Sequence, residues 1–209
     1  MRTRLRKATP DDAKAFLYIK EQLPLMLNED NTSSGGFLLG TDEATYIDYI
    51  NSSYCMVAEE DNKVIGFGII FPDEKLRESE VWIRRHSASW SIDLTKYESR
   101  SLCYFEQFAF LTGHKRAAVA LAYHITNWAF SNGHQTLFAT TVNKPVKNLA
   151  AIPFVHAANG CLAGNIDETY PVIGHINSDI HLVEADDFYE QAMKHPLYPM
   201  VLAHNIIIE

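Results

Sequence analysis

Hydrophobic and polar positions along the chain alternate between the periods of strands and of helices. The first segment, 3–7, alternates as a strand does, and Thr9-Pro10-Asp11-Asp12 then supplies a cap hydroxyl, a first-turn proline and two acids. Apolar residues follow at helical spacing until Pro24, which should end or bend the helix. A polar, glycine-bearing stretch over 28–40 predicts a loop, and Asp42 should open a second short helix.

Further along, β-rich runs predict a sheet. Segments 54–58 and 64–71 are joined by Asp61-Asn62-Lys63, which predicts an antiparallel hairpin. Two more strands are expected over 101–111 and 136–142, and extended structure should resume at Cys161.

Helical spacing returns in two of the intervening segments, 117–130 and 146–158. Asn132-Gly133 should terminate the first of these helices. The charged and aromatic segment 73–100, helical over 74–85, is too long for a simple connection and should cover something. At the end of the chain, Ile206-Ile207-Ile208 would add an edge strand or meet a neighbouring chain, as in a homodimer. The order of elements predicts an α/β (α+β) fold.

Composition adds limits to this picture. The 209 residues, 47% hydrophobic and 21% charged, fit one globular domain over 1–209, with a tail at about 185–209. Neither a signal peptide nor a membrane-spanning run is visible, so we expect a cytoplasmic protein that does not enter the membrane. Three widely spaced cysteines, Cys55, Cys103 and Cys161, are expected to be reduced, buried packing residues.

A net charge of −8 argues against nucleic-acid binding, which needs a basic face. The acidity favours a cationic or amine-bearing substrate, or else simply keeps the protein soluble. Histidines such as His124 and His181 have no ligand spacing of the HExxH kind, so no metal is expected.

The segment with the clearest chemistry is the strand 104–111 with the turn and helix start that follow it. The helix start would offer unpaired N–H groups and a partial positive charge, and Ala117-Ala118-Val119-Ala120 would let an anion approach the backbone. His114, Lys115 and Arg116 add side-chain cations. This segment therefore predicts an anion site.

The same segment resembles the acetyl-CoA-binding motif of GNAT-type N-acetyltransferases, which reads Arg or Gln, two residues, Gly, one residue, Gly or Ala. Lys115 falls on the Arg/Gln position, Ala118 on the first Gly and Ala120 on the second. Two positions depart from the motif, because Ala118 replaces a Gly and Arg116 stands where another Gly is usual. Alanine would narrow the space for the backbone, which would weaken the binding of CoA or shift its pose.

A second stretch, 142–161, is similar to the end of the GNAT fold, and in particular to a bacterial subgroup that reads Val-Asn, a Pro, Asn, Ser, Phe-His and Gly-Phe. The resemblance covers most of the chain and follows the order of the family fold. It implies a mixed, mostly antiparallel sheet that is flanked by helices and splayed at the cofactor strand. For acetyl-CoA it implies a set of binding residues: Phe108, Ala109, Phe110, His114, Lys115, Arg116, Ala117, Ala118, Val119, Ala120, Asn143 and Asn148.

Acetyl transfer to an amine needs a base near neutral pH, and Glu106 lies where many GNAT enzymes carry a carboxylate. Strand alternation predicts that Glu106 shares a face with Phe108, opposite Gln107, and apolar neighbours would raise its pKa. The alternative is an ordinary surface acid. The leaving-group acid of the subgroup falls on His156 when counted from Gly160, or on Val155 when counted from Asn148. His156 is otherwise a packing residue.

By the same resemblance, the acceptor pocket would be lined by Phe37, Leu38, Trp90 and Tyr97, unless these only pack within a lid. The expected function is transfer of acetyl from acetyl-CoA to a primary amine of a small molecule or peptide, by direct attack in a ternary complex. An alternative is a catalytically weak or inactive module that binds acyl-CoA as a sensor or partner subunit. A plain structural domain is the third alternative.

Overall fold

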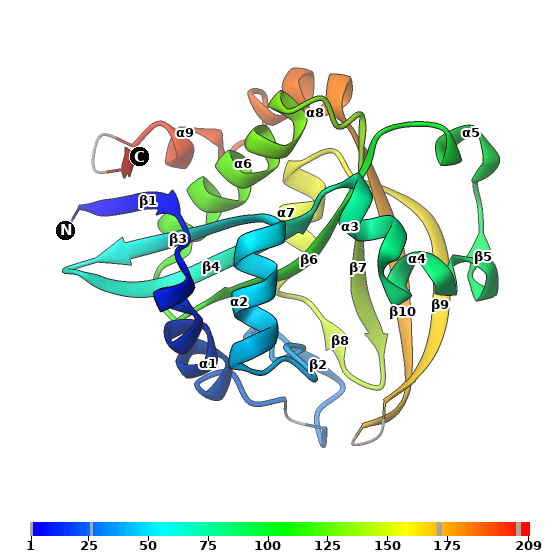
Figure 1. Ribbon diagram of the computed structural model, residues 1–209, viewed down its shortest axis with the longest axis horizontal. Coiled ribbons are helices and arrows are strands. Elements are labelled where there is room, and N and C mark those ends of the chain that lie inside the picture. The colour runs from blue at the N-terminus through cyan, green and yellow to red at the C-terminus, as the bar shows by residue number, and fades with distance from the viewer. Residues whose placement is uncertain (1, 26, 171–172, 204–205) are drawn as a thin grey trace.

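A nine-stranded sheet organises the computed structural model, which describes residues 2–25, 27–170, 173–203 and 206–209 (Figure 1). The strands of this sheet are β1 (Thr3–Lys7), β3 (Tyr54–Glu60), β4 (Lys63–Phe71), β5 (Ser89–Trp90), β6 (Leu102–Phe110), β7 (Thr136–Lys144), β9 (Cys161–Tyr170), β10 (Gly174–Glu184) and β11 (Ile206–Ile208). Two short strands, β2 (Asn31–Thr32) and β8 (Lys147–Asn148), form a separate pair.

The helices are α1 (Ala13–Glu21), α2 (Glu43–Ser52), α3 (Asp73–Glu78), α4 (Glu80–Arg84), α5 (Thr95–Glu98), α6 (Lys115–Ser131), α7 (Ile152–Ala157), α8 (Ala185–Ala192) and α9 (Tyr198–Val201), with 3₁₀ turns at η1 (Pro10–Asp12) and η2 (Arg85–Ser87). None of the helices in the described ranges combines the length and the apolar character needed to cross a bilayer.

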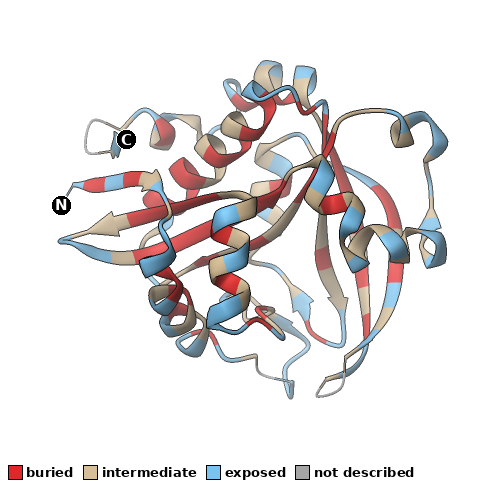
Figure 2. Cartoon of the chain, in the orientation of Figure 1, coloured by how far each residue is buried: buried red, intermediate tan, exposed pale blue. Residues whose placement is uncertain are grey.

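The strand order is β11-β1-β3-β4-β6-β7-β10-β9-β5, and most neighbours are antiparallel. Parallel pairing joins β1 to β11 and β6 to β7. Helices cover both faces of the sheet, α1 and α2 on one and α6 and α8 on the other, and burial is concentrated where they meet it (Figure 2). This mixed, largely antiparallel sheet flanked by helices confirms the expected fold class.

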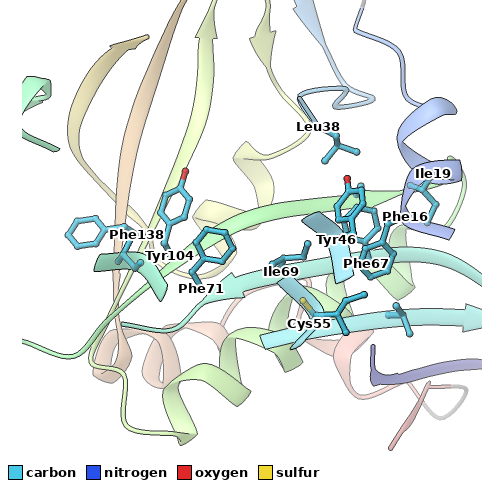
Figure 3. Packing of buried hydrophobic residues seen from close by; sticks show 14 of the residues in the cluster. Phe16, Ile19, Leu38, Tyr46, Cys55, Phe67, Ile69, Phe71, Tyr104 and Phe138 are labelled. Atoms are coloured by element: carbon cyan, nitrogen blue, oxygen red, sulfur yellow. The ribbon is translucent and has the colours of Figure 1, made fainter. Parts of the chain in front are cut away.

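On the α1 and α2 face, aromatic side chains form the centre of the core. Phe16 of α1 stacks on Phe67 of β4 with ring centroids 4.0 Å apart, and Tyr46 of α2 meets Phe16 edge-on at 5.3 Å (Figure 3). All three side chains are fully buried. Full burial of one such aromatic side chain contributes about 1.5–3 kcal/mol relative to leaving it exposed, so this trio fixes both helices on the sheet.

On the opposite face, α6 buries one side against the middle of the sheet through residues such as Leu121 and Ile125. Gly68 of β4 permits this approach, because a Cβ there would lie 3.1 Å from a methyl group of Leu121. Gly66 permits the Phe110 ring to lie across β4, since its Cβ would fall 2.3 Å from that ring. Two glycines of one strand therefore let α6 and the end of β6 pack closely.

Most of the elements expected from the pattern are present, including the hairpin at Asp61 and Asn62, where both residues have positive φ. The edge strand expected at the end of the chain is confirmed, because β11 pairs with β1. One cysteine was predicted wrongly: Cys55 and Cys103 are buried, but Cys161 is exposed at the start of β9.

The helix predicted over 146–158 was also wrong in its first half. There β8 pairs with β2 instead, and the amide of Lys147 donates to the carbonyl of Asp30 at 2.9 Å. Only α7 remains helical. The helix predicted over 74–85 is two helices, because Ser79 has an extended backbone and caps α4 by accepting a hydrogen bond from the amide of Trp82.

The segment 73–100 is joined to the sheet by strand pairing. Its strand β5 pairs with β9, so that Ser89 faces Asn165 and Trp90 faces Gly164. Gly164 makes the pairing possible, because a Cβ there would lie 2.7 Å from the carbonyl oxygen of Ser89. The segment thus extends the sheet beyond β9 and forms a fixed wall over one end of it (Figure 1).

Candidate active site

A fork in the sheet marks the site. Strands β6 and β7 pair in parallel from Leu102 and Thr136 to Phe105 and Ala139, and beyond that point they diverge (Figure 1). The rest of β6 stays paired with β4 alone, and the rest of β7 with β10. Main-chain groups on the facing edges of the two strands are therefore available to something that enters the fork. This confirms the splay expected at the cofactor strand.

A β-bulge in β6 lies at the same level as the fork. Phe105 pairs with Ile70 and Gln107 pairs with Ile69, which leaves Glu106 as an extra residue without a partner on β4. An inserted residue shifts the alternation of all the residues that follow it. The bulge therefore decides which side chains of β6 point to each face.

The prediction that Glu106 lies opposite Gln107 was wrong for this reason. The Gln107 side chain points toward α2, where its Oε1 accepts a hydrogen bond from the Tyr46 hydroxyl and its Nε2 donates to Thr41 Oγ1, both at 2.9 Å. Phe108 packs on the α6 face instead. Glu106 lies on the α2 side, where its charge acts on Tyr46 and Tyr49.

Burial raises the pKa of the Glu106 carboxyl to about 7. The nearby guanidinium of Arg84 opposes this rise, and the carboxylate of Glu168 adds to it. A carboxyl with a pKa in this range exchanges its proton readily at neutral pH. Glu106 therefore has the acid–base property that a general base requires.

A cavity of about 1150 Å³ runs through the fork and joins Glu106 to the N-terminus of α6. Most of the residues singled out in the sequence line it: Phe37, Leu38, Trp90, Glu106, Phe108, Ala109, Phe110, His114, Lys115, Ala118, Val119 and Asn148. Arg116 and Ala117 line a smaller hollow beside the α6 start. The structure thus brings Glu106 and part of the predicted anion site, including His114, Lys115 and Ala118, to one continuous space.

Four further predicted site residues line neither hollow. His156 is exposed on α7, whereas Val155, its alternative, is buried and lines the cavity. Asn143 lies on β7 and lines neither hollow. Tyr97, on α5 of the segment 73–100, has its ring 6.2 Å from that of Phe138. Ala120 is buried in the core on the side of α6 that faces the sheet.

The N-terminus of α6 is left open toward the cavity. Its N-cap residue, His114, makes no side-chain cap, and its Nδ1 instead lies 3.1 Å from Oε2 of Glu60. The amide of Ala118 already donates to the His114 carbonyl at 3.0 Å, so the free amides are those of the first turn, 115–117. Lys115 and Arg116 are exposed, and within the described ranges neither forms an ion pair.

This arrangement fits a pyrophosphate. Main-chain donors at a helix start and two unengaged cations meet the needs of such an anion. Because Ala118 uses its amide within the helix, its methyl group costs the site no donor. The exchange of glycine for alanine therefore removes no free hydrogen-bond donor from the first turn.

Several cavity residues had no signal in the sequence. Arg84 of α4 donates to Oε1 of Glu168 on β9 at 2.5 Å, and both residues line the cavity. His181 of β10 lies 2.8 Å from Oγ1 of Thr141, also in the lining. Each pair joins residues at least 40 positions apart, which no local motif records. Across the described residues, no three His, Cys, Asp or Glu side chains gather as metal ligands would.

Comparison with known proteins supports the fold. No protein-family model and no curated protein matches the sequence. Among solved structures, an N-acetyltransferase from Staphylococcus aureus Mu50 superposes with a TM-score of 0.60 and 16% identity, over 88% of this chain and 99% of that one. A putative acetyltransferase from Salmonella typhimurium, solved with its cofactor acetyl-CoA, gives 0.58 and 13%, over 88% and 94%.

A third structure, the polyamine N-acetyltransferase of Drosophila melanogaster that forms N-acetylagmatine, gives a TM-score of 0.55 and 11% identity, over 87% of this chain and 99% of that one. Identities this low establish a common architecture alone. The chain therefore has the fold of the GNAT N-acetyltransferases.

Proposed function

We propose that the protein binds acetyl-CoA and transfers the acetyl group to a primary amine of a small molecule or peptide, by direct attack in a ternary complex. The observation that carries this proposal is the position of Glu106, a carboxyl with a pKa near 7 at the fork of the sheet, in one cavity with the open start of α6. The base and the anion site are thus the two ends of a single reaction space.

On the cofactor side, the first-turn amides of α6 with Lys115 and Arg116 hold the pyrophosphate. The pantetheine arm lies in the fork, where its amides pair with the main chain of Phe108 and Phe110, since this edge of β6 faces no strand beyond Phe105. Asn148 contacts the arm from the other side of the cavity. Bound in this way, acetyl-CoA supplies a thioester carbonyl beside Glu106.

On the acceptor side, aromatic and acidic groups favour an amine. Leu38 and Trp90 line the same cavity as Glu106, and Glu168 supplies a second carboxylate there. Such a site holds the carbon chain of an amine against apolar side chains, and the Glu106 carboxylate attracts its nitrogen. The Drosophila neighbour, whose acceptors are polyamines, is consistent with a cationic acceptor.

At Glu106 the ionised carboxylate takes the proton that the attacking nitrogen must lose. The bond from nitrogen to the carbonyl carbon forms, the carbon–sulfur bond breaks, and its electron pair leaves on sulfur. The thiolate then leaves as such or takes a proton from water. The proposed step assigns no role to His156, which is exposed on α7 and does not line the cavity.

Calorimetry with acetyl-CoA and assays of thiol release over a panel of amines test the proposal. We expect binding, and release of free thiol with at least one amine, which Glu106→Gln reduces about 100-fold or more. The matched control is Glu74→Gln, an exposed carboxylate at the start of α3. Failure to bind acetyl-CoA contradicts the proposal. Tight binding without release for any amine supports the binding module instead.

A further inference from the structure

The loop segment 33–40, here termed the strap, connects the two sides of the fork. Residues 33–39 all line the cavity. The strap follows β2, which pairs with β8, the strand that comes directly after β7 in the chain. It leads to Thr41, which is hydrogen-bonded to Gln107 on β6. One end of the strap is therefore attached beside each strand of the fork.

The strap is held mainly at these two ends. Among the residues that the structure describes, no main-chain hydrogen bond joins the strap to another main-chain group. At the β8 end, the amide of Lys147 donates to the carbonyl of Asp30, and the amide of Leu149 donates to the carbonyl of Thr32, both at 2.9 Å. The described strands include none that pairs with the β6 end, so that end depends on side chains.

At the β6 end, three buried side chains form a chain of hydrogen bonds. The Tyr46 hydroxyl donates to Oε1 of Gln107, and Nε2 of Gln107 donates to Oγ1 of Thr41, each at 2.9 Å. The Thr41 hydroxyl then donates to the carbonyl of Leu39, inside the strap, at 3.3 Å. The Tyr46 hydroxyl also points toward Leu38 of the strap (Figure 3). Because all three residues are at most 7% exposed, loss of one bond would leave a buried polar group without a partner.

The bulge of β6 brings Gln107 to this position. Glu106 is the extra residue of the bulge, and Gln107 is the next residue, paired with Ile69. Side chains of adjacent residues in a regular strand point to opposite faces, but here both Glu106 and Gln107 line the cavity. The strap is thus anchored to the residue that directly follows the proposed base.

We propose that Gln107 is a positioning residue, which holds the strap through Thr41 and so fixes the side of the cavity where the acceptor binds. Gln107 acts on the acceptor through the strap and not by contact. The consequence for the acceptor rests on the proposed function, but the anchoring of the strap does not.

The direct test is limited proteolysis with chymotrypsin, in which mass spectrometry measures the rate of cleavage after Phe37 or Leu38. Leu38 is buried, so cleavage there requires the strap to detach. We expect Gln107→Met and Thr41→Val, which nearly keep the size of each side chain, to raise this rate about five- to thirtyfold. Thr41→Ser is the matched control, because it keeps the hydroxyl and should retain most of the native resistance.

Two further variants separate this role from a loss of overall stability. In the double variant of Gln107→Met and Thr41→Val, cleavage should be little faster than in Gln107→Met alone, because both changes remove the same bond. Ile125→Val creates a small cavity in the core on the opposite face of the sheet and should leave the cleavage rate unchanged. Thermal unfolding verifies that each variant folds.

Kinetics supply a second readout, with an amine that the protein acetylates. Gln107→Met and Thr41→Val should raise the KM for this amine about three- to tenfold and lower kcat by less. The affinity for acetyl-CoA should be unchanged, because the pairing of β2 with β8 stays intact. A variant that only lost part of its folded population would instead lower kcat and keep the KM.

Equal cleavage rates in Thr41→Val and the native protein overturn the proposal. Effects that multiply in the double variant, or an equal increase in Ile125→Val, also overturn it. Should Gln107→Met not fold, the comparison of Thr41→Val with Thr41→Ser still carries the test. Because proteolysis needs neither acetyl-CoA nor turnover, its outcome is separate from that of the acetyl-transfer assay.

Discussion

The hydroxyl of Tyr104 lies 2.7 Å from Oγ1 of Thr140, so one side-chain hydrogen bond joins β6 to β7 at the point where their main chains separate. Tyr104 and Phe105 are the last two residues of β6 that pair with β7. The Tyr104 hydroxyl contacts Thr140, one residue beyond the last paired residue of β7. This bond helps to define where the fork opens, and therefore where a bound molecule meets Glu106.

Tyr104→Phe removes this bond while it keeps the ring. We expect the free energy of unfolding to fall by about 0.5–1.5 kcal/mol, because the net value of one such hydrogen bond is of this size. Urea denaturation measures the change. Tyr18→Phe is the matched control, since Tyr18 is 53% exposed and its hydroxyl should contribute nothing measurable. An equal loss in both variants would argue against a role for the bridge.

Because burial raises the pKa of Glu106 to about 7, the fraction of ionised base should double between pH 7 and alkaline pH and fall about tenfold per unit below pH 6. The ratio kcat/KM for the acetylation of an amine should therefore rise with pH and reach half its plateau near pH 7. The profile is best measured with an acceptor amine of low pKa, whose own titration lies below this range. A profile that is flat between pH 5.5 and 8 would exclude Glu106 as the base.

The same pKa affects stability. The folded pKa of Glu106 lies above the ordinary value of 4.5, so its favourable contribution is fully present below pH 4.5 and is lost as the pH rises through about 7. Glu106→Gln, which cannot ionise, should therefore stabilise the protein at pH 8 relative to the native protein, by about 1–3 kcal/mol, and have little effect at pH 4.5. Denaturant unfolding at the two pH values measures the difference. Equal effects at both would contradict the assigned pKa.

The open start of α6 predicts a salt-dependent affinity for acetyl-CoA. Lys115→Ala and Arg116→Ala should each weaken binding about three- to tenfold at low salt, and less at 0.3 M salt, because exposed charges are screened. Calorimetry at two salt concentrations measures this. Lys14→Ala, an exposed lysine of α1 on the other face of the sheet, is the control and should leave the affinity unchanged. Weakening that is independent of salt would indicate a structural effect.

Local sequence pattern predicted the elements that carry their own signals. Three such signals are the small residues of α6, the turn at Asp61 and Asn62, and the β-rich run of β4. Each of them indicates one structure within a few residues. The bulge at Glu106 was not predictable in this way, because it is a register shift against β4 and depends on both strands. For this reason the composition of the β6 faces was predicted wrongly beyond Phe105.

Only part of the candidate site was predicted, because the sequence pattern reports groups that are adjacent along the chain and not groups that the fold brings together. Lys115 and Arg116 could be identified as site residues because they stand next to the predicted helix start in the sequence. Arg84 and Glu168 were not, because 84 residues separate them and only the pairing of β5 with β9 brings their segments together. His156 was predicted as the leaving-group acid from a count along the sequence that left the choice between His156 and Val155 open. In the structure Val155 of α7 is buried and His156 is exposed.

The pairing of β1 with β11 has a consequence for the order in which the molecule folds. It joins residues about 200 positions apart, such as Thr3 and Ile206, and closing so long a loop is entropically costly. The residues just before β11, including Leu197, Tyr198 and Val201, also line the cavity beside α6. We therefore expect the β1–β11 pairing to form after the more local pairings of the sheet, and with it the part of the cavity wall that these residues supply.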